Sequence, residues 1–373
     1  MNLEEHAAKP LLAAAGIAVP DGEVVSDPAG AAQAAARLGP CVVKAQVAAG
    51  RRGKAGGIRA AATPAEAKAA AEAILGLTIG GYPVARLLVE RQVDVRRELY
   101  AAVLTDAASK GPLILVSAAG GIDVEELAER DPQALVRIPV DIRHGIEAEE
   151  IAPRLAPLGL ATGPKLAEVL TRLYRVYAEH DAELVEINPL ALTAAGALVA
   201  LDCKLVIDDA AAPRRPELAA LASPELRTPL EQRAQAQGLR LIELDGDVGV
   251  LANGAGLTMT TMDAVRHYGG APANFLEIGG EAYRLGRPAL EVVLANPKVR
   301  SLVVNFCGAF ARTDVMTAGI VDAWQALRPA VPVFFSIHGT GEDEAIAMVR
   351  ERLGLEPFDL MDDAVKAAVD APR

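Results

Sequence analysis

Aromatic residues are scarce in this chain of 373 residues, of which they make up 3%. The core must therefore be filled by aliphatic side chains, and few rings are present on which the bases of a nucleic acid could stack. Cysteine is scarce too, since Cys41, Cys203 and Cys307 are the only ones and lie far apart in the sequence. This spacing excludes a disulfide framework and a zinc cluster, and it fits a reducing cytoplasm.

Positive charge and long apolar runs are also lacking. The 37 basic residues are outnumbered by 49 acidic ones, which gives a formal charge of −12. Such a chain is a poor candidate for non-specific binding to nucleic acid or to an anionic membrane. No apolar run approaches the ~18 residues of a membrane span, and residues 1–10 lack the apolar core of an export signal. We therefore expect a cytoplasmic protein with no nucleic acid and no membrane as partner.

The composition that is present, 51% hydrophobic and 23% charged residues, is typical of a globular protein. The length predicts two or three domains. Strands and helices alternate irregularly over residues 1–207, where helices are expected at 28–38, 64–75 and 165–180. Residues 208–237 are rich in Pro, Ala and charge, and they read as a linker, with or without a short helix.

A more regular pattern begins near Leu239. Each of its apolar strands is followed by a glycine-containing turn and then by a helical pattern; the strands are 249–253, 273–278, 301–306 and 331–337. Strands that alternate with helices in this way predict a parallel, doubly wound sheet. Ligands of such sheets bind at the carboxyl ends of the strands, against the N-termini of helices.

The strongest local motif joins a strand lysine, Lys44, to the glycine-rich basic loop of residues 49–57, AGRRGKAGG. A fixed cation and backbone N–H groups left accessible by glycines are what a triphosphate requires. The loop is neither a Walker A loop nor a dinucleotide-binding fingerprint. A solvated hairpin tip with incidental basic residues is the alternative, but a cationic cluster is unusual in so acidic a chain, which favours the phosphate site.

A second motif lies in residues 184–204, where LVEINPL, a turn and LVALDCK read as a β-hairpin. If its centre falls near the middle of the turn, Asn188 lies opposite Asp202 and Glu186 opposite Lys204. A carboxylate beside an amide oxygen suits Mg²⁺, which takes its remaining ligands from phosphate and water. The alternative is a hairpin whose polar face makes ordinary cross-strand pairs.

Glycine turns follow the strands of the second half. In residues 253–257, NGAGL, the glycines allow a tight strand-to-helix turn that leaves the helix N–H groups facing the strand end, which is an anion site by geometry. The same argument applies to residues 279–280, 307–309 and 338–341.

Nucleophiles are not evident, because the histidines form no HxxH or HExxH spacing; His338 is the best placed of them.

Long motifs occur in a fixed order along the chain: VVKAQVAAGRRGKAGG, LVERQVDVRRELY, LVEINPL with LVALDCK, and LANGAGLTMTTMDAV with PANFLEIGG. In these motifs the chain resembles the β subunits of succinate–CoA ligase (ADP-forming) and their close relatives, the malate–CoA ligase β subunits. The resemblance implies an α/β protein with an ATP-grasp nucleotide-binding domain over residues 1–230. The linker-like segment, residues 208–237, overlaps the end of this domain. The resemblance further implies a flavodoxin-like CoA-ligase domain, a doubly wound parallel sheet, over residues 239–373.

The resemblance also implies an activity, cofactors and a partner. A carboxylic acid, CoA and ATP would give acyl-CoA, ADP and phosphate in a reversible reaction that uses Mg²⁺. The phosphate would pass through a histidine of a separate α subunit, which also binds CoA. That arrangement fits the lack of a convincing nucleophile in this chain.

Site residues follow from the resemblance, motif by motif. The nucleotide phosphates would be held by Lys44, Arg51, Arg52 and Gly53, and the base and ribose by Glu90, Val93 and Glu98. Magnesium would be held by Asn188 and Asp202, and Glu186 would face the phosphohistidine. The organic acid would contact Asn253, Ala309, Phe310 and Ala311.

The chain departs from the family pattern at several positions. Arg51 stands where the family usually has a glycine, Pro10 is expected to interrupt the first helix, and Phe310 is bulky for a pocket that takes a small dicarboxylate. Because of Phe310 the identity of the acid stays open. Succinate, the acid of the family, is the default and malate is the alternative. A nucleotide-binding regulatory or scaffold subunit, and an ATP-grasp ligase that acts alone on an acyl phosphate, also stay open. So do the preference between ADP and GDP and the choice between αβ and α₂β₂.

Overall fold

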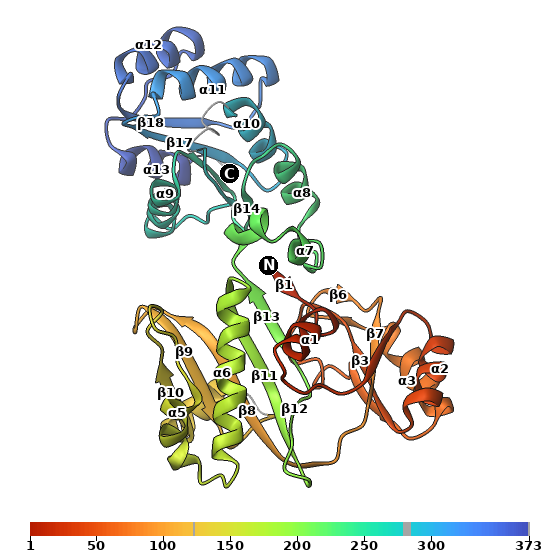
Figure 1. The fold of residues 1–373 in the computed structure, drawn as a ribbon. Helices are drawn as coiled ribbons and strands as arrows, with labels where there is room; N and C mark the ends of the chain where they lie inside the picture. Colours follow the sequence, from red (N-terminus) through yellow and green to blue (C-terminus); the bar gives the residue numbers. More distant parts are fainter. Residues whose placement is uncertain (122–123, 279–284, 372–373) are drawn as a thin grey trace. The chain divides into compact units, whose positions relative to one another are not determined.

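The structure is a computed structural model that describes residues 1–121, 124–278 and 285–371, and the chain forms two compact units, Met1–Leu226 and Arg227–Arg373 (Figure 1). Each unit has its own buried core of mostly aliphatic side chains, as the composition predicts. No helix in the described ranges is long and apolar enough to cross a membrane.

The first unit contains a small lobe built on an antiparallel sheet of order β2-β7-β3-β4. Its strands are β2 (Gly22–Val25), β7 (Leu87–Arg91), β3 (Cys41–Ala45) and β4 (Ile58–Ala61). Two helices, α2 (Pro28–Leu38) and α3 (Pro64–Leu75), pack on it with Ala-rich buried faces. Asp27 accepts a hydrogen bond from the N–H of Gly30 and Thr63 one from Glu66, so side chains cap both helices at the predicted starts.

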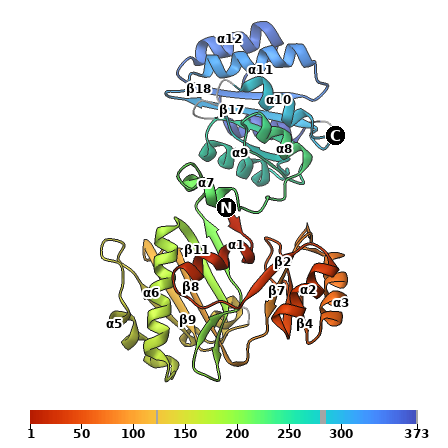
Figure 2. The same cartoon turned by 45° about the vertical axis from the view of Figure 1, so that its right-hand side comes forward.

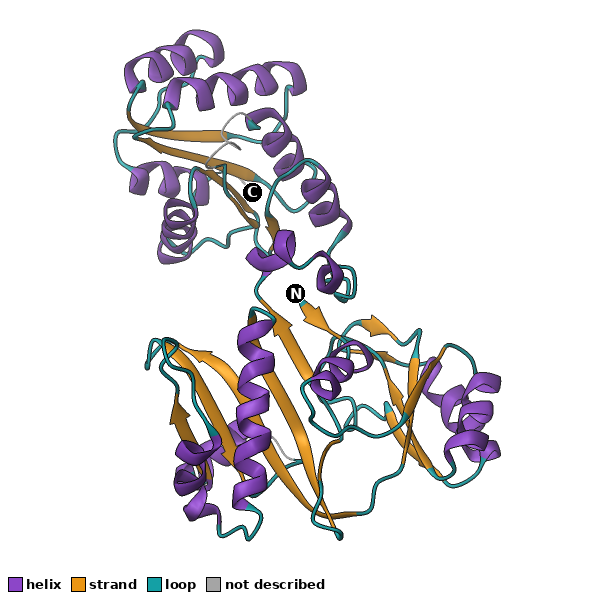
Figure 3. Ribbon diagram, in the orientation of Figure 1, coloured by secondary structure: helices purple, strands orange, loops and turns teal. Residues whose placement is uncertain are grey.

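The large lobe of the first unit is an antiparallel sheet of order β1-β13-β11-β8-β9-β10, with β12 paired to β11 (Figure 3). The strands are β1 (Asn2–Leu3), β13 (Lys204–Ile207), β11 (Ala182–Thr193), β8 (Val95–Asp106), β9 (Gly111–Ser117), β10 (Leu135–Pro139) and β12 (Leu198–Ala200). Helix α6 (Gly163–Glu179) lies across β11 and β8 and buries Leu166, Leu170 and Leu173, which confirms the helix predicted from its apolar spacing.

Shorter elements complete this unit. They are α1 (Glu5–Ala14), β5 (Thr78–Ile79), β6 (Tyr82–Pro83), α4 (Val124–Arg130), η1 (Pro132–Ala134), α5 (Ala148–Ile151), η2 (Ala152–Leu158), η3 (Asp209–Arg214) and α7 (Pro216–Ala219). The expectation that Pro10 interrupts the first helix is wrong, because α1 continues through it. A proline removes only one helical hydrogen bond, and buried residues on both sides of it, Ala8 and Leu12, hold the helix against the core.

The second unit is a parallel sheet covered on both faces, which confirms the predicted doubly wound arrangement (Figure 2). Its central strands are β15 (Val248–Ala252), β17 (Ser301–Gly308) and β18 (Val333–Gly339); β16 (Asn274–Leu276) joins β15 through parallel bridges and pairs antiparallel with β14 (Leu241–Glu243). One face packs on α9 (Ala255–His267) and α13 (Met361–Val369). The other packs on α8 (Pro229–Ala236), α10 (Gly286–Leu294), α11 (Thr313–Leu327) and α12 (Glu342–Leu353).

Candidate functional site

A cavity of about 730 Å³ lies in the first unit, between the two lobes. Its volume is in the range of small-molecule and cofactor sites. The residues expected to hold nucleotide, metal and phosphohistidine come from both lobes, and all of them line it: Lys44, Arg51, Arg52, Gly53, Glu90, Val93, Glu98, Glu186, Asn188 and Asp202. Segments that are more than 100 residues apart in the sequence thus meet in one cavity.

The alternation of β3 places Lys44 at this cavity. Cys41, Val43 and Ala45 are fully buried in the core of the small lobe, and the period of two turns Lys44 to the opposite face of the sheet. There Lys44 Nζ lies 2.8 Å from Glu5 Oε1 and 2.6 Å from Glu90 Oε2, and it donates to the carbonyl of Leu201. The predicted fixed cation is therefore held by anions of its own chain.

The basic loop folds back onto β3 instead of standing in solvent. Arg52 is 7% exposed, and its Nη1 donates to the carbonyl of Ala45 at 2.8 Å. A Cβ on Gly57 would lie 2.6 Å from Ile79 Cδ1 and 3.1 Å from the carbonyl oxygen of Arg52, so the close return of the loop favours glycine there. Arg51 adopts a left-handed φ of 58°, a conformation that glycine takes more readily. The alternative of a solvated tip is therefore wrong for Arg52, although Arg51 is exposed.

The hairpin has the register that the sequence predicts. Glu186 on β11 pairs with Lys204 on β13, and Leu190 pairs with Ala200 on β12. Between these two pairs the ladder is interrupted, and its register against β8 shifts between Ile187 and Leu190. Asn188 and Asp202 belong to this interrupted stretch, where side chains are presented to the cavity instead of being enclosed by regular pairing.

The described contacts that hold Asn188 and Asp202 include one oxygen of each side chain. The N–H of Gly121 donates to Asn188 Oδ1 at 2.8 Å. Asp202 Oδ1 accepts from Arg52 Nη2 at 2.6 Å and from the N–H of Cys203 at 2.8 Å. Within the described contacts, Asp202 Oδ2 has no partner, and the Asp202 side chain is 31% exposed. A carboxylate and an amide that both line the cavity are a donor set that fits Mg²⁺.

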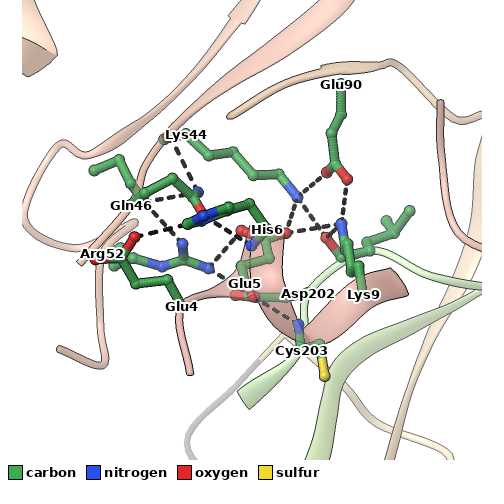
Figure 4. A network of polar contacts seen from close by, with 12 residues as sticks. Glu4, Glu5, His6, Lys9, Lys44, Gln46, Arg52, Glu90, Asp202 and Cys203 are labelled. Carbon is green, nitrogen blue, oxygen red and sulfur yellow. Dashed lines mark hydrogen bonds and ion pairs between the residues drawn. The ribbon is translucent and has the colours of Figure 1, made fainter. Parts of the chain in front are cut away.

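A buried ion-pair network connects the two walls of the cavity (Figure 4). Glu5 of α1 is its centre, because Glu5 Oε1 faces both Lys9 and Lys44 at 2.8 Å while Glu5 Oε2 accepts from Arg52 at 2.8 Å. Arg52 continues to Asp202, which joins the small lobe to the hairpin of the large lobe. Charged hydrogen bonds of this kind fix side-chain positions strongly when they are buried.

The protonation states follow from these contacts. Burial alone would raise the pKa of the Glu5 carboxyl, but Lys44, Lys9 and Arg52 outweigh it and hold this pKa well below its usual range. Burial alone would lower the pKa of Lys44, but the carboxylates around it raise the pKa above its ordinary value. Glu5 and Lys44 are therefore both ionised at neutral pH.

The sequence analysis missed Glu5 and Lys9, although they are 3% and 4% exposed and contact predicted site residues. A usable signal was present, because a glutamate and a lysine four residues apart face the same side of a helix. His6 and Gln46 were missed in the same way: Gln46 Oε1 accepts from the His6 N–H at 2.9 Å, which ties α1 to the end of β3.

In the second unit the predicted acid-binding residues lie at the carboxyl ends of β15 and β17. The Asn253 amide is bound to backbone: its Nδ2 donates to the carbonyl of Cys307 and its Oδ1 accepts from the Cys307 N–H, both at 2.8 Å. Ala309 and Phe310 are exposed, with Phe310 fully so, and Ala311 packs against the core. Asn253 thus holds two strand ends together, and the turn of Ala309–Ala311 stands beside them.

The other glycine turns differ from one another. At residues 338–341 the N–H of Gly339 donates to the Glu342 carboxylate at 2.5 Å. The anion bound by this N–H group is therefore a side chain of the protein itself. Gly254 begins α9 with a φ of 77°, as a tight strand-to-helix turn requires. The turn predicted at residues 279–280 lies outside the described residues.

Comparison with known proteins supports this architecture. A model of the ATP-grasp domain family matches residues 2–192, and a model of the CoA-ligase family matches residues 251–365. The predicted fold class, an ATP-grasp domain followed by a CoA-ligase domain, is thereby confirmed.

The full chain is also similar to individual proteins. The succinate–CoA ligase (ADP-forming) β subunit of Chloroflexus aurantiacus is 40% identical over 376 residues, which cover 100% of this chain and 99% of that one. The succinate–CoA ligase (GDP-forming) β subunit of Thermus thermophilus is 43% identical over 350 residues, or 92% of each chain. The structure of ATP citrate lyase from Methanothrix soehngenii has a TM-score of 0.75 at 24% identity and covers 99% of both chains, which shows a shared fold.

Proposed function

The chain belongs to the family of succinate–CoA ligase β subunits, an acid–thiol ligase family, and we propose that it binds the nucleotide of that reaction in the cavity of its first unit. One observation carries the proposal. The buried cations Lys44 and Arg52 lie on one wall of the cavity, and the oxygen ligands Asn188 and Asp202 lie on the other. A polyphosphate with its metal needs both kinds of group.

In this proposal each wall has a task. Lys44, Arg52 and the backbone around Arg51 and Gly53 bind the nucleotide phosphates, and Glu90, Val93 and Glu98 border the base and ribose. Asn188 and Asp202 hold Mg²⁺, which when bound offsets charge on the phosphate that is transferred. These positions are supported by their common lining of one cavity.

The phosphate transfer requires a second subunit. We propose that a histidine of a separate α subunit takes the γ-phosphate of ATP, which leaves ADP in the cavity. The phosphohistidine then phosphorylates the carboxylic acid, and CoA displaces the phosphate to give acyl-CoA. We assign the contact with the incoming phosphohistidine to Glu186, which lines the cavity and accepts a hydrogen bond from Tyr100 at 3.4 Å.

The acid is proposed to bind near Asn253 and the turn of Ala309–Ala311 in the second unit, with succinate as the default. Malate is the second candidate, because the bulky Phe310 stands in the turn that is expected to contact the acid. A regulatory subunit that binds nucleotide without turnover is the remaining alternative. We propose a cytoplasmic αβ or α₂β₂ enzyme, in keeping with three free cysteines.

The test is co-expression with an α-type subunit that carries a glycine-flanked histidine, followed by an assay of ATP- and CoA-dependent acyl-CoA formation on succinate and malate, with ADP and GDP compared in the reverse direction. Turnover with the complex and none with this chain alone is the expected result. Product formed by this chain alone would instead identify an ATP-grasp ligase that needs no partner. Binding of MgATP without phosphate exchange in a well-formed complex would identify a regulatory subunit.

A further inference from the structure

Lys9 lies behind the cavity and not on its wall. Its side chain is 5% exposed, and among the described residues it does not line the cavity, whereas Lys44 does. Lys9 and Glu5 are one helical turn apart on α1, so both side chains reach the same buried network (Figure 4).

The two lysines share their acceptors. Lys9 Nζ lies 2.5 Å from Glu90 Oε1, 2.8 Å from Glu5 Oε1 and 2.9 Å from the carbonyl of Leu201. Lys44 Nζ lies 2.6 Å from Glu90 Oε2 and 2.8 Å from the same Glu5 oxygen, and it donates to the same carbonyl. Each ammonium group therefore duplicates the partners of the other.

A nucleotide phosphate would compete with these carboxylates for Lys44. Moving Lys44 toward a phosphate is strongly unfavourable if it leaves a buried carboxylate without a cation. Glu5 would still have Arg52, but the described contacts of the Glu90 carboxylate are with Lys9 and Lys44. Among the described contacts, Lys9 is therefore the cation beside Glu90 other than Lys44.

We propose that Lys9 is a positioning residue for nucleotide binding, which keeps the Glu5 and Glu90 carboxylates compensated so that Lys44 can leave them for a phosphate. This inference rests on the proposed nucleotide site. If Lys9 had a merely structural role, replacing it would lower the stability of the chain. Its effect on nucleotide affinity would then not depend on whether residue 90 is charged.

The test is a double-mutant cycle in the full chain, with calorimetric titration of MgADP. Lys9→Met removes the charge and keeps an unbranched side chain, and we expect the Kd to rise about tenfold or more, equivalent to about 1.4 kcal/mol. Glu90→Gln alone gives the cost of losing a carboxylate that lines the cavity, and in that background Lys9→Met should weaken binding much less than it does in wild type, because the carboxylate that Lys9 compensates is absent. Lys68→Met, which changes an exposed lysine of α3, is the matched control and should bind as wild type does.

The outcomes separate the two proposals. Failure of the wild-type chain to bind MgADP would contradict the proposed nucleotide site itself. Wild-type affinity in Lys9→Met, or an equal loss caused by Lys9→Met in the wild-type and Glu90→Gln backgrounds, would overturn the positioning role alone. If Lys9→Met does not fold by circular dichroism, the double variant is compared with Glu90→Gln, and equal affinities are expected. In the complex with the α subunit, Lys9→Met should raise the KM for ATP and leave the KM for the acid unchanged.

Discussion

The two candidate sites of this chain are built from different kinds of contact. In the first unit, side chains from α1, β3, β7, the basic loop and the hairpin form a buried network of ion pairs around a cavity. In the second unit, Asn253 bonds to backbone and Phe310 is fully exposed at the strand ends. Charge changes at the first site should therefore affect folding and nucleotide binding together, whereas side-chain changes at the second should affect the acid alone.

Replacing Lys44 should have the largest effect. Lys44→Met removes a cation that faces Glu5 and Glu90, and breaking a buried ion pair costs about 3–5 kcal/mol. We expect a lower free energy of unfolding in urea and a Kd for MgADP raised by about 100-fold, equivalent to about 2.7 kcal/mol. An unchanged Kd in a folded variant would show that the cavity does not bind phosphates through Lys44.

The metal ligand should give the next largest effect. Asp202→Asn keeps the size of the side chain and removes its charge, so the Kd for ADP in the presence of Mg²⁺ should rise by about tenfold, or 1.4 kcal/mol. The Kd measured in EDTA should change much less, and Asp359→Asn, at an exposed residue of the second unit, should leave both values as in wild type. Equal losses with and without Mg²⁺ would argue against metal binding at Asp202.

The network should also make the free energy of unfolding depend on pH. The pKa of Glu5 in the folded chain lies below its ordinary value of 4.5, so the stabilisation is complete above about pH 4.5 and is lost as the pH falls toward the folded pKa. Urea unfolding between pH 7 and pH 3 should show this loss in wild type and a shallower one in Glu5→Gln. Glu351→Gln, on the exposed side of α12, should keep the wild-type slope; a Glu5→Gln slope equal to it would contradict the account.

A backbone change near Asn188 should have a moderate effect. A Cβ on Gly120 would lie 2.1 Å from the carbonyl oxygen of Leu99, so Gly120→Ala must displace the turn whose Gly121 N–H holds Asn188. We expect a loss of about 1–3 kcal/mol of stability and weaker MgADP binding. Gly163→Ala, where the added Cβ meets open space, is the control. Equal behaviour of the two variants would show that the turn adapts without cost.

The smallest effect on folding is expected at Phe310. Its ring is fully exposed, so Phe310→Ala should change the free energy of unfolding by no more than about 0.5 kcal/mol. In the complex with the α subunit, it should alter the KM for the acid and leave the KM for ATP unchanged. A change in the KM for ATP instead would mean that the two sites are not separate in the way described above.

Regular local patterns explain which parts could be predicted. Helix α3 begins at Pro64 and ends at Leu75 as its capping residues indicate, and the pairing of Glu186 with Lys204 follows from counting residues across a turn. The role of Glu5 could not be derived in this way, because its partners Lys44 and Arg52 are 39 and 47 residues away and meet it only after the lobes fold. The contacts of Asn253 could not be predicted either, because its side-chain amide bonds to the backbone of a residue 54 positions further along the chain.

The central claim is that one bound nucleotide touches both walls of the first-unit cavity. The most direct measurement uses chain labelled with ¹⁵N-glycine and titrated with Mn²⁺–ADP, whose paramagnetic ion broadens nearby amide signals. Gly53 belongs to the basic loop and Gly121 holds Asn188, so both signals should broaden together, whereas ADP with diamagnetic Mg²⁺ should leave both of them sharp. Broadening of one of the pair without the other, or of neither, would contradict the account.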